Sequence, residues 1–421
     1  MRCAGLLLAS FAFLASGCKK PTANLPPEEI PTAPPPIMSA APPVPVCADQ
    51  EDAPLAGDDD EVLVGELAHK DGQLAFGASL RHEGRKVHAV LLTPAAKIAP
   101  PKVVPLAPSV GDEPPPRVFA EAGALYAVHF ASAPKKRELS LSRIDIGKST
   151  ASEVGRLPVP SGDFYAFDAA MVGAKAMVVS EEDRPVAGKL VGAVRARWMG
   201  AAPAASGQTA GILISPETSD AESPRVVGLP DGFAVIWLTR VAEPATEAGL
   251  EGAGEDRSYT FVEMRHIGTD GQPDAQPLRL TSPKGHVVAF EAVPAAGGVS
   301  VYVQDEGARG EGAGGHLHRV DVVGAVAKAP VELLGSGMGH ALFTLGRDHG
   351  APGAESLVLG YADTAESPRI AVISPNGGAS PRLLPEGPSR LLGVHQGNLF
   401  RMTFGADGGK GAPRLSRTRC P

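Results

Sequence analysis

The sequence predicts an all-β protein whose main domain is a β-propeller of about seven four-stranded blades. The first observation is composition: Gly (50) and Pro (41) together make 91 of 421 residues, about 22%, against about 12% in average proteins. These residues break helices repeatedly, while 43% hydrophobic residues are enough for a packed core. The other two observations are a well-defined four-strand unit at residues 223–281 and its weaker repetition about every fifty residues.

The unit at residues 223–281 has four short apolar segments separated by turn signals. The segments are 224–230, 233–238, 258–267 and 277–281, and Asp231-Gly232 and Asp270-Gly271 occupy hairpin positions. The second segment is apolar on both faces, whereas the fourth alternates apolar and polar residues. Inner strands buried on both sides and a half-exposed outer strand are what a propeller blade requires.

Similar units follow one another along the chain. They are predicted at 61–108, 116–160, 162–216, 284–335 and 338–386, and a last unit from Ser389 has only three strands. We expect residues 44–47 (Val44 to Cys47) to supply the missing fourth strand and close the ring. The count is then seven blades; six or eight remain open because unit boundaries are soft. A pair of β-sandwiches is the structural alternative.

The N-terminus has the pattern of an export signal. Arg2 is followed by an apolar run over residues 4–14 that is shorter than the ~20 residues a membrane-spanning helix needs. Small residues then precede a cysteine in Leu14-Ala15-Ser16-Gly17-Cys18. This segment resembles the lipobox of bacterial lipoproteins, with the large aliphatic residue one place earlier than in the commonest form. An ordinary signal peptide that leaves Cys18 as a thiol is the alternative.

The lipobox resemblance implies that residues 1–17 are removed and that Cys18 is acylated and anchors the protein in a membrane of the cell envelope. Lys19 after the cysteine favours the outer membrane over the inner one. Residues 18–46 form the predicted tether, in which 19–46 contain ten prolines. Such a segment prefers extended polyproline conformation and spans roughly 85 Å. The folded domain is then predicted over residues 47–421.

The cysteines predict a covalent closure of this domain. Cys3 leaves with the signal peptide and Cys18 carries lipid, so that Cys47 and Cys420 remain. Two cysteines in an exported protein are most simply a disulfide, and this one joins the two ends of everything that folds. Two free thiols are the alternative.

The repeats also resemble, at low identity, the propeller-type repeats of lipoproteins from high-GC Gram-negative bacteria. The shared features are Pro-x-Val before an Asp-Gly turn, an aromatic-aliphatic strand that contains Trp237, and the Arg265-x-Ile267-x-x-Asp270-Gly271 pattern. This resemblance implies a fold and a location. It implies no single activity.

No catalytic signature is recognisable in the sequence. Gly-x-Ser-x-Gly and His-Glu-x-x-His are missing, and the glycines around Lys410 lack the spacing of a phosphate-binding loop. The net charge of −8 argues against a nucleic-acid partner. The sequence therefore assigns no catalytic residue, cofactor or metal.

Three weaker clusters of chemically active residues remain. His316 and His318 point to one strand face and become metal ligands only if a third residue joins them. The run Asp58-Asp59-Asp60-Glu61 is read as a solvated charge run rather than a calcium site. Asp168, Glu181, Glu182 and Asp183 are candidate carboxylates for polysaccharide cleavage, although an aromatic content of 5% leaves few rings to stack on sugars.

The predicted insertions all fall between the second and third strands of their units. They cover 81–86, 132–137, 181–189, 243–257 and 305–315. Such loops emerge on one face of a propeller, and repeat proteins often bind through the face that carries insertions. The sequence therefore predicts a lipid-anchored envelope protein that acts as a non-enzymatic interaction or scaffold module with a protein or glycan partner. An envelope hydrolase or lyase that acts on polysaccharide with carboxylates near the propeller axis is the alternative.

Overall fold

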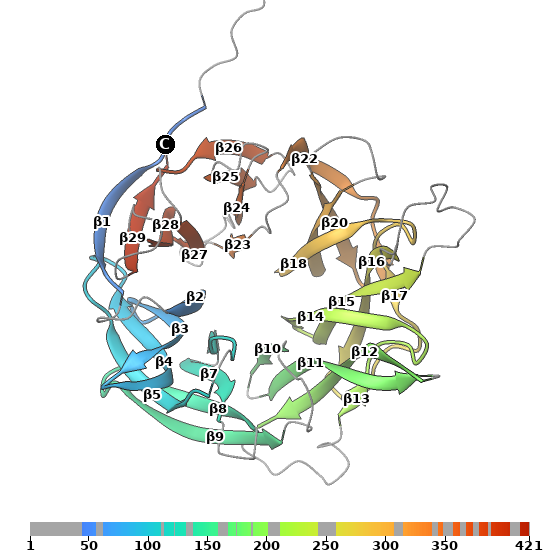
Figure 1. Ribbon diagram of the computed structural model, residues 1–421, viewed down its shortest axis with the longest axis horizontal. Coiled ribbons are helices and arrows are strands. Elements are labelled where there is room, and N and C mark those ends of the chain that lie inside the picture. The colour runs from blue at the N-terminus through green and yellow to red at the C-terminus, as the bar shows by residue number, and fades with distance from the viewer. Residues whose placement is uncertain are drawn as a thin grey trace, which may run out of the picture. The chain divides into compact units, whose positions relative to one another are not determined.

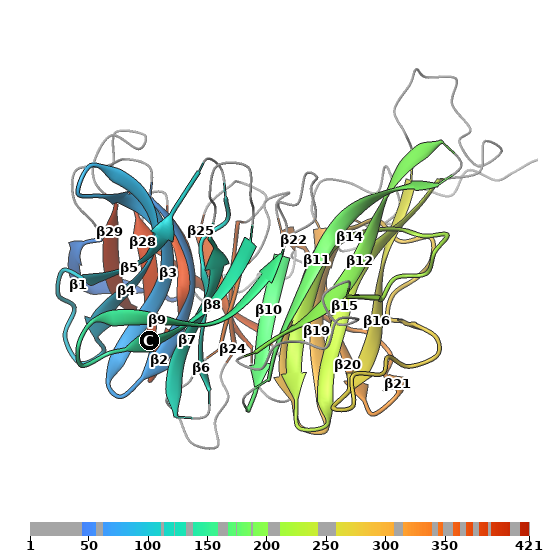
Figure 2. The ribbon, with the colours of Figure 1, turned by 90° about the horizontal axis from the view of Figure 1, so that it is seen from below.

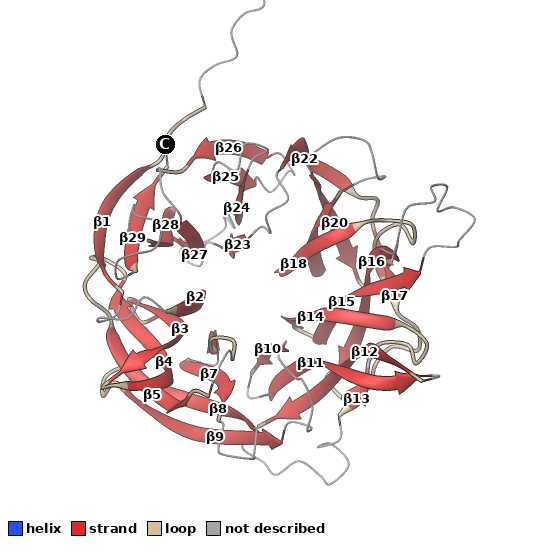
Figure 3. Ribbon diagram, in the orientation of Figure 1, coloured by secondary structure: helices blue, strands red, loops and turns tan. Residues whose placement is uncertain are grey.

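The computed structural model divides the chain into residues 1–43 and residues 44–421 and describes only the second part. The segments left out of that second part are 56–61, 111–112, 122, 132–137, 159–166, 174, 187, 201–210, 243–257, 307–314, 339–343, 348–356, 363–367, 374–378, 386–388, 405–412 and 421. The described residues form strands, turns and loops (Figure 3). None of them belongs to a helix long and apolar enough to cross a membrane.

Seven antiparallel sheets stand around a common axis as the blades of a β-propeller (Figure 1). Seen from the side, their strands run roughly along that axis (Figure 2). In blades 1 to 6 the first strand in the chain lies nearest the axis, as β2, β14 and β18 illustrate in Figure 1; in blade 7 the innermost strand is β27. The predicted fold class and the count of seven blades are confirmed.

The first three blades match the predicted units at 61–108, 116–160 and 162–216. Blade 1 contains β2 (Leu63–Lys70), β3 (Gln73–His82), β4 (Arg85–Pro94) and β5 (Lys102–Pro108). Blade 2 contains β6 (Arg117–Glu121), β7 (Ala124–Phe130), β8 (Glu138–Asp145) and β9 (Thr150–Pro158). Blade 3 contains β10 (Phe167–Val172), β11 (Lys175–Val186), β12 (Lys189–Met199) and β13 (Ile212–Leu213).

The next three blades match the predicted units at 223–281, 284–335 and 338–386. Blade 4 contains β14 (Asp220–Leu229), β15 (Gly232–Ala242), β16 (Ser258–Gly268) and β17 (Leu278–Arg279). Blade 5 contains β18 (Val287–Ala295), β19 (Gly298–Asp305) and β20 (Gly315–Val323), and both β21 (Val326–Ala327) and β22 (Val331–Met338) pair with β20. Blade 6 contains β23 (Thr344–Arg347), β24 (Leu357–Ala362), β25 (Pro368–Ile373) and β26 (Ala379–Leu383).

Blade 7 is built from both ends of the domain. Its inner strands are β27 (Ser389–His395), β28 (Asn398–Thr403) and β29 (Arg414–Arg419), and its outer strand is β1 (Ala48–Pro54), antiparallel to β29. The expectation that an N-terminal strand closes the ring is correct, but its position at 44–47 is wrong. Val46 instead makes a parallel bridge with Leu383 of blade 6, and the Cys47 amide donates to the Leu383 carbonyl at 2.8 Å.

The core lies between the blades. Seven clusters of buried apolar side chains each join two neighbouring blades, and the cluster between blades 7 and 1 contains Phe76, Leu91 and Phe400. The second strand of each blade is sandwiched, as predicted for β15, in which residues 232–239 are all buried and Trp237 has no exposed surface. Burial on both faces is why these strands read as continuous apolar runs rather than as alternating ones.

Candidate functional site

Six charged side chains from six first strands gather around the propeller axis. Their order around the ring alternates in sign. They are Glu66 on β2, Arg117 on β6, Asp168 on β10, Arg225 on β14, Glu291 on β18 and Arg390 on β27. We call these six residues the axial cluster. The side chains of β23, the first strand of blade 6, are outside the described set.

Blades 1, 2 and 3 are joined by one arginine between two carboxylates. The Arg117 Nη1 donates to Glu66 Oε1 at 2.8 Å, and its Nε lies 3.0 Å from Asp168 Oδ1. The other oxygen of Asp168 accepts from the Val226 backbone amide of blade 4 at 2.9 Å. This chain of contacts ties four consecutive blades together at the axis.

Blades 4 and 5 are joined by a second ion pair of the axial cluster. Arg225 donates through Nε and Nη2 to the two oxygens of Glu291, at 3.2 Å and 3.1 Å. Such a two-point contact fixes the planes of both groups and is stronger than a single ion pair. Charges on non-adjacent blades also act on one another, since Glu66 of blade 1 influences the pKa of Glu291 of blade 5. The six side chains therefore share one electrostatic environment.

The two glutamates of the axial cluster differ in protonation behaviour. Arg117, by charge and by hydrogen bond, holds the pKa of Glu66 below its ordinary value against the opposing effect of burial. Burial raises the pKa of Glu291, and the negative charge of Glu66 adds to this effect. The Glu66 side chain is 52% exposed and that of Glu291 only 22%. The axial cluster thus contains one carboxylate that stays ionised and one that takes up a proton more readily.

Arg390 is the one arginine of the axial cluster without a hydrogen-bonded or ion-paired partner among the described residues. Arg390 is exposed as a residue, yet partial loss of hydration beside the axis lowers the pKa of its guanidinium; the charge of Arg117 acts in the same sense, while Glu66 and Glu291 oppose the shift. Arg117 and Arg225, by contrast, each have a carboxylate in contact, and their pKa values are raised above the ordinary arginine value. Among the described residues, no acceptor therefore contacts the hydrogen-bond donors of Arg390.

The four carboxylates predicted for polysaccharide cleavage do not form one group. Asp168 belongs to the axial cluster, whereas residues 181–183 lie on β11, the second strand of blade 3. Glu182 contacts Arg195 and Arg197 of β12, and Glu181 accepts from the Ser223 amide at 2.9 Å. Asp168 itself is ion-paired with Arg117 and accepts a hydrogen bond from the Val226 amide. Both carboxylate oxygens are therefore used in contacts between blades, and neither is free to act as a general acid or base.

The predicted disulfide is present, whereas several other predicted sites lie outside the described residues. Cys47 and Cys420 are bonded, with their Cα atoms 4.2 Å apart. Cys18 and the Asp58–Glu61 run lie outside the described residues, as do 132–137 and 243–257. His316 and His318 share one face of β20 as expected, and Glu332 of β22 joins them.

Two of the predicted insertions, 81–86 and 181–189, are not loops. All the insertions nevertheless fall between the second and third strands of their blades in chain order, as predicted. β3 and β4 are joined by Glu83-Gly84 alone. β11 continues through Val186 and pairs with β12 from Ala176 to Val186. The extra residues of blade 3 therefore extend a β-hairpin rather than a loop.

Blade 1 also contains a Ser-His-Glu constellation that the sequence did not reveal. His88 Nδ1 lies 2.9 Å from Ser79 Oγ, and its Nε2 lies 3.0 Å from Glu113 Oε2. A hydrolase triad contains the same three kinds of group, but there the serine contacts Nε2 and the carboxylate contacts Nδ1, the reverse of the contacts here. All three are buried, with the His88 and Glu113 side chains 0% exposed, so that no substrate reaches the Ser79 hydroxyl. The three side chains form a buried hydrogen-bonded group that joins Glu113, in the segment after β5, to β3 and β4.

The axial cluster has a sequence signal that motif searches miss. Glu66, Arg117 and Asp168 are spaced by 51 residues, because each occupies the first strand of consecutive units. A charged residue that recurs in an otherwise half-buried first strand at the repeat period is therefore the sign of such a cluster.

Comparisons with known proteins support the fold and no more. No family model matches the chain, and no curated protein matches it. Among solved structures, a lectin from Burkholderia pseudomallei aligns with a TM-score of 0.52 at 14% identity, over 83% of this chain and 94% of that one. A prolyl endopeptidase aligns with a TM-score of 0.49 at 12% identity over 86% of this chain, which spans only 50% of the endopeptidase. An α-L-arabinanase from Penicillium chrysogenum aligns with a TM-score of 0.47 at 12% identity, over 78% and 99%. Likeness at this level of identity shows the fold alone, so the function has to be argued from the site.

Proposed function

We propose that this protein is a lipoprotein of the cell envelope, anchored through acyl chains on Cys18, whose propeller binds an anionic ligand at the axial cluster. The lipobox-like segment before Cys18 and the Pro-rich tether support the anchored location. The arrangement of charges around the axis supports the binding role.

The observation that carries the binding role is the unpaired guanidinium of Arg390. Three arginines and three carboxylates surround the axis, yet the contacts among the described residues use only Arg117 and Arg225. A guanidinium offers five donors in a planar fork that fits a carboxylate or phosphate with two parallel bonds. A ligand anion at Arg390 gives this guanidinium the partner that the other two arginines already have.

The remaining axial groups indicate which kind of anion fits. Glu66 is half exposed and ionised, so it accepts hydrogen bonds from hydroxyl groups. A ligand that carries both a carboxylate and hydroxyl groups satisfies Arg390 and Glu66 together. Uronic-acid oligosaccharides of acidic envelope or capsule glycans combine these groups, and we propose this class as the ligand.

Calorimetric titration with uronic-acid oligosaccharides tests the binding role. The wild-type chain should bind, a neutral oligosaccharide of equal length should not, and Arg390→Gln should weaken binding at least about tenfold, which corresponds to one lost charge-assisted hydrogen bond. Arg143→Gln, at an exposed arginine of β8 far from the axis, is the matched control and should bind as the wild type does. Equal affinities of the wild type and Arg390→Gln for the uronic-acid oligosaccharide would refute the proposed binding role.

A polysaccharide hydrolase or lyase is the second candidate, and the contrast between Glu66 and Glu291 favours it. Pairs of carboxyl groups whose environments push their pKa values apart are the usual acid and base of such enzymes. Both glutamates are ion-paired to arginines, however, which suits a fixed binding site better than proton transfer. Turnover of the bound oligosaccharide that disappears in Glu291→Gln, with binding retained, would make this the function.

The anchor is tested separately. Mass spectrometry of the mature N-terminus should find an acylated Cys18, and Cys18→Ser should move the protein from the membrane fraction to the aqueous fraction. An unmodified Cys18 would refute the lipoprotein proposal and leave the axial binding proposal intact.

A further inference from the structure

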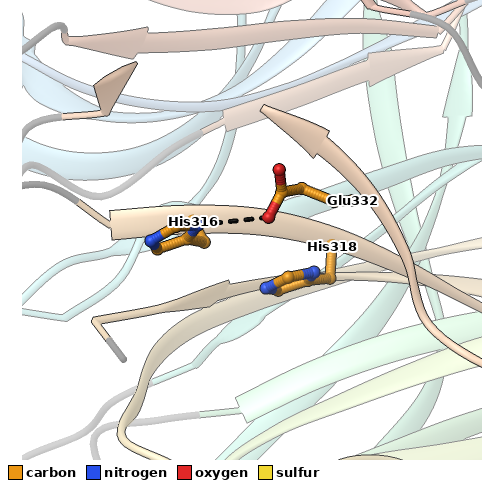
Figure 4. A group of neighbouring side chains, drawn as sticks. All are labelled: His316, His318 and Glu332. Carbon is orange, nitrogen blue, oxygen red and sulfur yellow. Dashed lines mark hydrogen bonds and ion pairs between the residues drawn. The ribbon is translucent and has the colours of Figure 1, made fainter. Parts of the chain in front are cut away.

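Blade 5 brings together three side chains that are good metal ligands (Figure 4). His316 and His318 come from β20 and Glu332 from β22. Their ligand atoms lie within 4.8 Å of one another, and no other such group of three occurs in the described part of the chain. We call these three residues the blade 5 cluster.

The strand geometry explains why these residues meet. Residues two apart on a strand point to the same face, and Leu317 between the histidines faces the core with no exposed surface. The two imidazoles stand nearly parallel, with ring centroids 6.1 Å apart and planes 9° apart. β22 pairs with β20 so that Glu332 is the direct partner of His318, and side chains of directly paired residues share a face.

The blade 5 cluster is already partly organised. His316 Nδ1 lies 3.2 Å from Glu332 Oε2, the contact drawn in Figure 4. A tetrahedral zinc ion with bonds of about 2.1 Å holds its ligand atoms roughly 3.4 Å apart. Rotation of half-exposed side chains is therefore enough to close the site, and the strands need not move.

We propose that His316, His318 and Glu332 bind a divalent transition-metal ion, with Zn²⁺ as the best match. Two imidazoles and a carboxylate suit zinc, whereas calcium and magnesium prefer sites made only of oxygen ligands. Three protein ligands leave a fourth position for water or for a group of a bound partner. Since the His316 side chain is 36% exposed and that of Glu332 is 55% exposed, the ion reaches this site directly from solvent.

Zinc titration of the full-length, chelator-treated protein tests this proposal. Calorimetry should detect one site in the wild type that is lost in His316→Ala and in His318→Ala, and that is weakened in Glu332→Gln. Loss of an outer partner of a metal ligand already costs about 10–100-fold in affinity, so removal of a ligand should cost at least as much. His82→Ala, at the end of β3 in blade 1, is the control and should bind as the wild type does.

The variants separate zinc binding at the blade 5 cluster from zinc binding at other sites. Other histidines and free thiols give heat that persists in every variant, so only the difference from wild type counts. Circular dichroism without metal should be the same for all variants, because none of the three residues lies in the core. Zinc binding that is equal in wild type and His318→Ala, or no binding at all, would overturn the proposal.

Discussion

Buried polar side chains decide how the stability of this protein responds to pH. His129 of β7 lies inside blade 2, where its Nδ1 contacts the Phe130 carbonyl at 2.9 Å and its Nε2 contacts Ser142 Oγ at 3.0 Å. Burial lowers the pKa of His129 from 6.5 to about 4. The unfolded chain therefore binds a proton at a pH where the folded chain does not.

The first prediction concerns this pH dependence. Because the folded pKa of His129 is depressed, its stabilising contribution is complete above pH 6.5 and is lost as the pH falls toward 4. Between pH 7.5 and 5 we expect a loss of about 2 kcal/mol in the free energy of unfolding from this residue. His129→Gln should reduce that pH-dependent loss, measured by urea unfolding at both pH values. His69, whose pKa is also lowered, remains in both proteins and cancels in the comparison. An unchanged pH dependence in the variant would contradict the assignment.

The second prediction concerns the buried arginine of blade 7. Arg401 is 1% exposed and donates to Thr418 Oγ1, Ser389 Oγ and Asp49 Oδ1 at 2.9, 2.8 and 2.7 Å. Arg401→Met removes this donor from all three groups, of which, among the described residues, only Asp49 Oδ1 keeps another donor, Thr418 Oγ1, and we expect a loss of about 2–3 kcal/mol in unfolding free energy. Arg414→Met removes an exposed ion pair with Asp52, between β29 and β1 of the same blade, and should cost less than about 1 kcal/mol. Equal effects would show that burial does not govern these contacts.

Glycines in the strands let neighbouring blades approach closely. A Cβ on Gly77 of β3 would lie 1.8 Å from the Pro116 carbonyl oxygen at the start of blade 2, and one on Gly393 of β27 would lie 2.4 Å from Leu67 Cβ. Part of the glycine excess in the composition is therefore explained by close contacts between blades rather than by turns.

The third prediction tests this close approach. Gly77→Ala should destabilise the protein by about 1–3 kcal/mol, as expected for overpacking against backbone that cannot easily move. Gly200→Ala is the control, because a Cβ there meets nothing within 4 Å. Thermal unfolding of both variants measures the difference. A Gly77→Ala protein as stable as the control would mean that the blades separate at low cost.

The strands differ in how well the sequence predicts them, and the reason is burial. Second strands such as β15 are buried on both faces and appear as apolar runs with Asp-Gly turns beside them. β1 is an outer strand with the sequence ADQEDAP and only one buried side chain. Its polar sequence has no strand signal. The closing strand is therefore predicted at the neighbouring segment 44–47, which contains Val44 and Val46. The axial cluster escapes prediction for a related reason, since its members lie one or more repeats apart in the chain and meet only through the ring.

At the scale of the whole molecule, the ring is closed by three kinds of contact at one place. β1 pairs with β29, ion pairs join Asp49, Glu51 and Asp52 to arginines of β28 and β29, and the disulfide joins Cys47 to Cys420 across a separation of 373 residues. A cross-link over so long a loop removes much of the entropy of the unfolded chain, by about 6 kcal/mol at most in the chain-entropy description. The strand pairing and the ion pairs act in the folded state instead.

The fourth prediction separates these two contributions. In Cys47→Ser/Cys420→Ser the hydrogen bonds and ion pairs of β1 remain, so the far-UV circular dichroism spectrum should not change. The free energy of unfolding should nevertheless fall by about 2–4 kcal/mol, which is the usual effect of removing a native disulfide. Reduced wild-type protein should match the double variant, because both lose the same constraint on the unfolded chain. If the double variant instead loses its β-sheet signal, the disulfide is needed to hold β1 in blade 7; if its stability equals that of the oxidised wild type, ring closure depends on β1 alone.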